Sequence, residues 1–211
     1  MSDNSPSPIS TDLVPSGGHL QGSSRVVHAD VSALFPGRWS PRGFSDRPVD
    51  QDVLDSLFEA ARWAPSCFNE QPARFLVASS EADLALFRPL LVDGNRAWAD
   101  RAPVIAFVLA ARQFRKKGTP NRWAGFDTGA AWMSLALQAS IRGLATHAMG
   151  GIHTDQVYET LRIDPEQWEV LCGLVIGWPD PDAPLPQWAR DAEAPNARRP
   201  LSEVVTYGPI P

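Results

Sequence analysis

The sequence is poor in cysteine and lacks several arrangements on which common enzymes depend. Its two cysteines, Cys67 and Cys172, stand far apart, which excludes a C-x-x-C redox motif and a cysteine zinc site. No G-x-G-x-x-G follows the first predicted strand, so a dinucleotide-binding Rossmann unit is not expected. Serine, histidine and carboxylate residues do not form a recognisable hydrolytic pattern either. The sequence therefore offers no obvious protein nucleophile.

An excess of basic residues is also missing. The formal net charge is −5, which argues against nucleic acid or an anionic membrane surface as the main partner. The first thirty residues lack a basic start followed by an apolar core, so we expect no secretory signal. The apolar stretch 103–111 is too short to cross a bilayer. With so few cysteines, a reducing cytoplasm is the expected location.

The composition is that of an ordinary globular protein. The chain has 211 residues, of which 44% are hydrophobic and 20% are charged, enough for one domain with its own core. Residues 1–30 are rich in serine, proline and glycine and have few large apolar side chains, so we predict a disordered N-terminal tail. We assign residues 31–211 to a single domain. The basic residues between 112 and 122 are interpreted as a solvated loop.

Hydrophobic periodicity predicts helices and strands in loose alternation. A helix capped by Asp50 has apolar residues at helical spacing, namely Val53, Leu54, Leu57, Phe58 and Ala61. Further helices are predicted at 81–91, 127–142 and 154–161. Strands are predicted at 73–78, 103–111, 144–149, 170–176 and 201–205, with a proline-rich linker at 179–195. Because no regular β-α-β series emerges, we expect an α+β fold with a mixed central sheet flanked by helices.

Two arginines and a serine alternate in the run Arg38-Trp39-Ser40-Pro41-Arg42-Gly43-Phe44. In an extended chain this odd spacing places the two guanidinium groups and the hydroxyl on one face. Arginine offers a rigid fork of donors that suits a phosphate, and Arg198 and Arg199 are available to close on the same group. The alternative is a surface loop whose arginines pair with nearby aspartates, Asp46 and Asp50.

Side-chain amides and hydroxyls gather in the turn Ala64-Pro65-Ser66-Cys67-Phe68-Asn69-Glu70-Gln71-Pro72. Amide groups of this kind can bind the polar edge of a flat heterocycle. Together with the arginine run, the turn suggests a phosphorylated aromatic cofactor. The alternative is that Asn69 and Gln71 only satisfy backbone groups of the turn and of the strand that follows.

These two motifs are followed by the glycine pair Gly150-Gly151 and by the late run Arg198-Arg199-Pro200-Leu201. In this order they resemble the FMN-dependent nitroreductase family, over a range from about Arg38 to Val205. The resemblance implies the nitroreductase-like α+β fold and an intertwined homodimer with FMN at its interface. The predicted helix 127–142 is apolar almost all round, which is consistent with a large subunit interface.

The resemblance also implies which residues bind FMN. They are Arg38, Trp39, Ser40, Arg42, Ser66, Cys67, Asn69, Gln71, Asn95, Met149, Gly150, Gly151, Arg198 and Arg199. The Gly150 N–H would donate to flavin N5, and a cation, Arg42 or Arg96, would lie near flavin N1. An ordinary glycine turn is the alternative at Gly150.

Three aromatic residues are candidates for the substrate side of the flavin: Phe68, Trp123 and Phe126. Aromatic residues more often belong to a core or an interface, which is the alternative for all three.

The activity implied by the resemblance is hydride transfer from NAD(P)H through flavin N5 to a nitroaromatic, quinone or related acceptor. The protein then needs no catalytic acid, base or nucleophile, because the cofactor carries the electrons. One alternative is another flavin enzyme on the same fold, such as an enone or acid dehydrogenase or a dehalogenase. The other is a flavin-binding or storage protein without catalysis. Apart from a second copy of the chain, small molecules are the expected partners.

Overall fold

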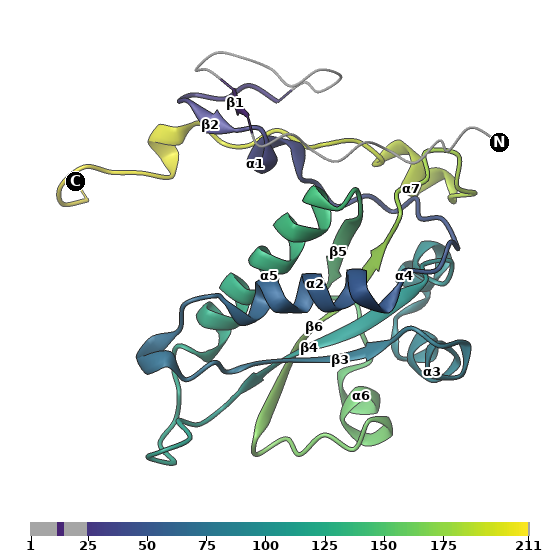
Figure 1. Ribbon diagram of the computed structural model, residues 1–211, viewed down its shortest axis with the longest axis vertical. Coiled ribbons are helices and arrows are strands. Elements are labelled where there is room, and N and C mark those ends of the chain that lie inside the picture. Colours follow the sequence, from purple (N-terminus) through teal and green to yellow (C-terminus); the bar gives the residue numbers. More distant parts are fainter. Residues whose placement is uncertain (1–11, 15–24, 211) are drawn as a thin grey trace.

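A four-stranded sheet lies at the centre of the computed structural model, which describes residues 12–14 and 25–210 (Figure 1). The strands are β3 (Ala73–Ala78), β4 (Val104–Ala111), β5 (Ala145–Met149) and β6 (Trp168–Gly177), in the order β3-β4-β6-β5. The α+β class is confirmed, but every pairing in this sheet is antiparallel, whereas a mixed sheet was predicted. Strands β4 and β5 run in the same direction, but β6 lies between them and separates them, so they do not form a parallel pair.

Strand β4 is the buried centre of the sheet and contributes side chains to both of its faces. The predicted strand 103–111 is thus confirmed, one residue shorter at its start. On one face, towards α2 and α5, lie Val104, Ala106 and Val108. On the other, towards α3, α4 and α6, lie Ile105, Phe107 and Leu109. Because successive strand residues point to opposite faces, an unbroken apolar run is what a strand covered on both sides requires.

Helices α2 (Gln51–Arg62) and α5 (Ala124–Ile141) cover the first face. Asp50 is the N-cap of α2, as predicted, but it accepts the Val53 and Leu54 N–H groups through its backbone carbonyl rather than its side chain. Helix α5 begins three residues before the predicted 127. It ends at Ile141, with Arg142 as its C-cap; Gly143 follows with a φ of 76°, in the left-handed region, and the Leu144 N–H donates to the Ala139 carbonyl at 2.8 Å.

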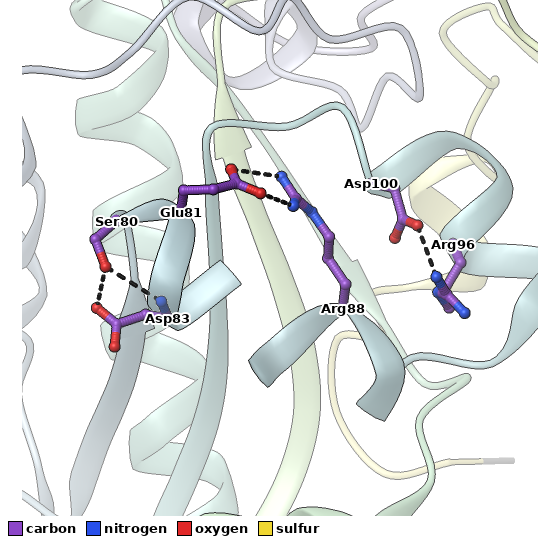
Figure 2. A network of polar contacts seen from close by, with 6 residues as sticks. All are labelled: Ser80, Glu81, Asp83, Arg88, Arg96 and Asp100. Carbon is purple, nitrogen blue, oxygen red and sulfur yellow. Dashed lines mark hydrogen bonds and ion pairs between the residues drawn. The ribbon is translucent and has the colours of Figure 1, made fainter. Parts of the chain in front are cut away.

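The second face is covered by α3 (Glu81–Phe87), α4 (Asp93–Ala99) and α6 (Thr154–Thr160), and Arg88–Leu90 continues α3 as a 3-10 turn. Figure 2 shows the polar contacts that stabilise this layer. Ser80 caps α3 by accepting the Asp83 N–H, and Arg88 pairs with Glu81 at 2.6 Å. Sequence periodicity missed α4, because its glycine and short polar residues are typical of a turn.

Part of the range predicted as a disordered tail has a defined place. Strand β1 (Leu13–Val14) pairs with β2 (Val31–Ser32), ahead of α1 (Leu34–Gly37), and the side chain of Val27 is buried. Residues 1–11 and 15–24 of the predicted tail lie outside the described residues. Among the residues described, no helix has both the length and the apolar character to cross a membrane.

The C-terminal part differs from the prediction. The stretch predicted as a linker contains α7 (Gln187–Asp191), which follows Pro186. Residues 201–205 do not form the predicted strand; Leu201–Glu203 is a 3-10 turn (η3) instead. A strand needs a neighbour for its backbone groups, and this segment extends away from the described sheet (Figure 1).

We expect Leu135→Ala to lower the free energy of unfolding by about 2–5 kcal/mol, because the Leu135 side chain is fully buried between α5 and the sheet. Urea unfolding at a fixed protein concentration measures this. The matched control is Leu86→Ala, a residue 46% exposed on α3, which should change the value by about 0.5 kcal/mol or less. Equal losses for both variants would contradict the assignment of α5 to the core.

Candidate functional site

The predicted arginine run forms the loop 38–44 between α1 and α2. The Glu193 carboxylate accepts the backbone N–H groups of Arg42 and Gly43 at 2.9 and 2.7 Å. The Pro41 carbonyl faces the ring of His147 on β5, with 2.8 Å between the oxygen and Nδ1. A carbonyl only accepts, so Nδ1 carries the proton. The loop is therefore attached to β5 and to the segment after α7.

Guanidinium groups crowd around this loop. Arg38 donates to the Ser40 hydroxyl at 3.3 Å, so two of the predicted phosphate ligands lie together. Burial lowers the pKa of Arg38, and the nearby positive charge of Arg198 lowers it further. Within residues 12–14 and 25–210, no carboxylate forms an ion pair with Arg38, Arg42 or Arg198. The alternative pairing with nearby aspartates is thus not formed, and an anion would relieve the repulsion.

Arg25 holds this arginine cluster together. Its guanidinium donates to the carbonyls of Pro36 and Arg38 at 2.7 and 2.9 Å, and to the Asn196 carbonyl at 2.9 Å. Burial lowers the pKa of Arg25, followed by the charges of Arg198 and Arg38. Three segments that are distant in the sequence are therefore joined at one buried side chain. Arg199, by contrast, is exposed and has no polar partner among the described residues.

The glycine pair after β5 is held from the side by α4. The Asn95 side-chain amide donates to the Gly151 carbonyl at 2.8 Å. A Cβ on Gly151 would lie 2.7 Å from the Asn95 amide nitrogen and 2.8 Å from a Val92 methyl carbon, so the contact requires glycine. Met149 is buried, while Gly150 is exposed with open space beside it. The predicted FMN-binding residues Asn95, Met149, Gly150 and Gly151 therefore lie next to one another and border one surface of the protein.

The arginine loop and this glycine turn are both connected to β5 and α4. His147 on β5 faces the Pro41 carbonyl of the loop, and its ring centroid lies 4.6 Å from that of Trp98 on α4, the helix that carries Asn95. Arg96, one of two candidates for the flavin N1 cation, pairs with Asp100 on its own helix at 3.1 Å (Figure 2). Arg42 has no such pair within the described chain, and its guanidinium carbon lies 5.8 Å from the centre of the Trp188 ring. The geometry favours Arg42 as the available cation.

The predicted amide turn contains a short 3-10 helix, Cys67–Asn69 (η1), with unusual backbone angles. Phe68, Asn69 and Gln71 have φ values of 53°, 57° and 52°, all in the left-handed region. Such residues cost about 1–3 kcal/mol each and gather at functional sites. The Ser66 hydroxyl accepts the Gln71 N–H, and the Asn69 carbonyl accepts the Gln71 amide, so Asn69 and Gln71 do support the turn itself.

The turn is fixed to the first turn of α5 through one bond, from the Cys67 N–H to the buried Asp127 carboxylate at 2.9 Å. This brings the three predicted substrate residues to the same end of α5. Phe68 is 85% exposed, Trp123 is 43% exposed and Phe126 is 78% exposed, so none of them is a core residue of this chain.

The two groups of residues in the predicted site lie at opposite ends of α2. The arginine cluster precedes α2 and the 66–71 turn follows it (Figure 1). Helix α2 has 12 residues and is therefore about 18 Å long. The cationic group and the amide turn are therefore separated by the length of this helix.

Four residues that position the site were missed from the sequence: Arg25, Asp127, His147 and Glu193. Arg25 fell in the predicted tail and Glu193 in the predicted linker, where no pattern marks a buried polar group. His147 has no acidic or metal-spaced partner in the sequence that would mark it. Asp127 carried a usable signal, since it is the one carboxylate in an otherwise apolar helix.

Comparison with known proteins gives a family. The model of the nitroreductase family matches residues 36–96 and 87–178, so the chain belongs to the nitroreductase family. A protein of Ralstonia nicotianae, provisionally named NADH dehydrogenase/NAD(P)H nitroreductase, is 31% identical over 63% of this chain and 77% of its own length. A similarly named protein of Xanthomonas oryzae is 35% identical, but the match spans only 48% of that protein and 45% of this chain.

A solved structure agrees with this assignment over nearly the whole chain. A crystal structure described as an oxidoreductase containing FMN has a TM-score of 0.85 and 38% sequence identity. The match covers 92% of this chain and 99% of the other.

We expect Glu193→Ala to lower the free energy of unfolding by about 1.5–3 kcal/mol, because the Arg42 and Gly43 N–H groups lose a charged acceptor. Denaturant unfolding measures the change. The control is Glu166→Ala, an exposed carboxylate ahead of β6, which should have little effect. A Glu193 variant as stable as the control would show that the contact contributes nothing.

Stability should also depend on pH through His147. Burial lowers the pKa of His147 below its usual value of 6.5, a shift that the Pro41 carbonyl partly offsets and the Arg42 charge reinforces. The unfolded chain then binds the proton more readily, so the free energy of unfolding falls as pH decreases through 6.5 towards the folded pKa. One proton accounts for at most about 1.4 kcal/mol per pH unit.

The variant His147→Asn should lose this part of the pH dependence between pH 7.5 and 5, as measured by urea unfolding at a series of pH values. His153→Asn, at an exposed histidine, is the control and should keep it. Parallel pH profiles for the wild type and His147→Asn would rule out His147 as the titrating group.

Proposed function

We propose that this protein binds FMN and uses NAD(P)H to reduce nitroaromatic, quinone or related acceptors. One observation carries the proposal: Arg25 binds the carbonyls of Arg38 and Asn196, which joins the segments of Arg38 and Arg198 beside the Ser40 hydroxyl, and neither arginine forms an ion pair with a carboxylate of the described chain. A phosphate ester with nearly two negative charges fits that cluster. The similarity to an FMN-containing oxidoreductase over 92% of the chain supports the same cofactor.

Each group of predicted residues has a role in this proposal. Arg38, Ser40 and Arg198 bind the phosphate, with Arg199 closing over it and Trp39 beside it. The exposed Gly150 presents its N–H to the edge of the ring at N5, and Asn95 sets the orientation of the turn through the Gly151 carbonyl.

Arg42 supplies the positive charge near N1. That charge favours an anionic reduced ring and so raises the reduction potential.

A homodimer completes the site in this proposal. The residues of the 66–71 turn, Ser66, Cys67, Asn69 and Gln71, would reach the ring from the second copy, with Phe68, Trp123 and Phe126 on the substrate side. The C-terminal segment supports an extended interface, because its large apolar side chains are exposed in one copy: Leu201 47%, Val204 68%, Tyr207 95% and Ile210 87%. Exposed apolar groups of this number are expected to be covered by a partner.

Hydride transfer through the flavin ring is the chemistry that the cofactor supplies when it is bound. The protein's own residues bind the phosphate, fix the ring edge and provide one charge. In this scheme no side chain donates a proton to the substrate or removes one from it. The aromatic residues at the end of α5 exclude water from the ring face and leave room for a flat acceptor.

The test combines spectroscopy with one variant. We expect the purified protein to be yellow and to lose its flavin absorbance on anaerobic titration with NADPH or NADH. Arg38→Ala should weaken FMN binding by about 10- to 100-fold through the lost charged hydrogen bonds, measured by fluorescence quenching. Riboflavin, which lacks the phosphate, should bind the wild type and Arg38→Ala equally. The control variant is Arg142→Ala, at an exposed site beyond α5.

A colourless protein that cannot be reconstituted with FMN would contradict the proposal as a whole. A yellow protein that NADPH and NADH both fail to bleach would favour a flavin-binding protein without catalysis. If Arg38→Ala weakened riboflavin and FMN binding equally, the phosphate assignment would be wrong.

A further inference from the structure

Two adjoining cavities lie next to the strained 66–71 turn, with volumes of about 440 and 350 Å³. Both are lined by Phe68, Glu70 and Lys116. Their other wall is the loop 112–121 between β4 and α5, which together with the turn lies at the lower left of the molecule in Figure 1. The cavities are large enough for an aromatic ring with substituents.

The loop is a closed structure rather than a loose connection. The Phe114 N–H donates to the Thr119 carbonyl at 2.9 Å, and the Gly118 N–H donates to the Phe114 carbonyl at 2.8 Å. Lys116 and Lys117 stand at its tip and are the only lysines in the chain. The other seventeen basic residues are arginines. The two ammonium groups are therefore held beside the cavity by a backbone of defined shape.

The charges around the cavity do not cancel. Among the residues that line the cavity, Glu70 carries the one carboxylate. This carboxylate accepts the Arg115 backbone N–H at 2.9 Å and lies 3.7 Å from the Arg115 guanidinium. That pair is neutral overall. Lys116 and Lys117 have no ion pair in the described part of the chain, so the cavity keeps a net positive charge.

The remaining wall is aromatic. The Phe68 and Phe114 rings meet edge to face with 6.2 Å between their centroids, and the Lys117 ammonium lies 6.0 Å from the centre of the Phe68 ring. Phe68 is 85% exposed on a backbone with a φ of 53°. A strained backbone that holds an aromatic ring out of the core is typical of a binding site.

We propose that this lysine pocket, formed by Phe68, Glu70, Phe114, Lys116 and Lys117, binds a planar ring that carries a carboxylate or a phosphate. The ring packs against the two phenylalanines, and the anionic group meets the two lysines. The role of the pocket rests on the proposed function, in which the ligand is one of the two reactants. Either the acceptor carries the anionic group, or the ring and anion are the adenosine 2′-phosphate of NADPH.

The experiment compares matched ligands that differ by one anionic group. On the acceptor side, 4-nitrobenzoate is compared with the neutral 4-nitrobenzamide; on the donor side, NADPH is compared with NADH. The variant is Lys116→Gln/Lys117→Gln in the holoenzyme. The control is Arg101→Gln/Arg142→Gln, which removes the same charge from exposed sites outside the pocket.

The variant should raise KM about five- to tenfold for the anionic member of one pair and leave its neutral or less charged partner unchanged. The difference should shrink in 0.5 M salt, because both lysines are exposed. Calorimetric titration of the oxidised holoenzyme with 4-nitrobenzoate, and separately with adenosine 2′-monophosphate, gives the same comparison without turnover. A change with 4-nitrobenzoate identifies the acceptor as the ligand, and a change with NADPH identifies the donor.

A Phe114→Leu variant tests the ring contact. Within the ligand pair that responds to the lysine variant, it should weaken the binding of the charged ligand and of its neutral or less charged partner alike. The inference is overturned if the lysine variant and the control give the same ratios for both pairs while 4-nitrobenzamide is still reduced. If no acceptor is reduced and the protein holds no FMN, the proposed function itself has failed, which is a different result.

Discussion

Repulsion between crowded guanidinium groups is the constraint on which the proposed cofactor site depends. Arg25 is buried, Arg38 is half-buried, and Arg198 adds a third positive charge nearby. Such an arrangement is costly in the free protein unless hydrogen bonds offset it, and the carbonyls that surround Arg25 do so. The same cost makes the cluster a strong site for an anion, because binding removes the repulsion that folding had to overcome.

The scaffold places this cluster and the 66–71 turn at opposite ends of α2, and the two ends differ in character. One end is cationic and hydrogen-bonded, with Glu193 and His147 attaching the loop to its surroundings. The other is aromatic and strained, and it is attached to α5 by Asp127. A ligand with a charged tail and a flat ring matches the chemistry of the two ends, as the proposed FMN site requires.

The sequence predicted the central elements well because their burial is continuous and periodic. The strand 73–78 has the predicted bounds, the strand within 103–111 lies within a residue of its prediction, and the helix after Asp50 begins where its cap predicted. Prediction failed where structure depends on partners far along the chain. The short helix α4, the helix α7 and the turn at 201–203 have little local signal, and the direction of strand pairing depends on the route of the chain through α5 and α6.

Local chemistry decided which residues had the means to bind a phosphate and a flat ring, because guanidinium groups, amides and glycines carry those properties wherever they stand. The sequence by itself therefore determined the family, the fold class and the motifs. Only the tertiary structure decided which of these groups share a surface. Arg25 and Glu193 became part of the site because folding brings residues more than 150 positions apart into hydrogen-bond contact, and no local pattern records such a contact.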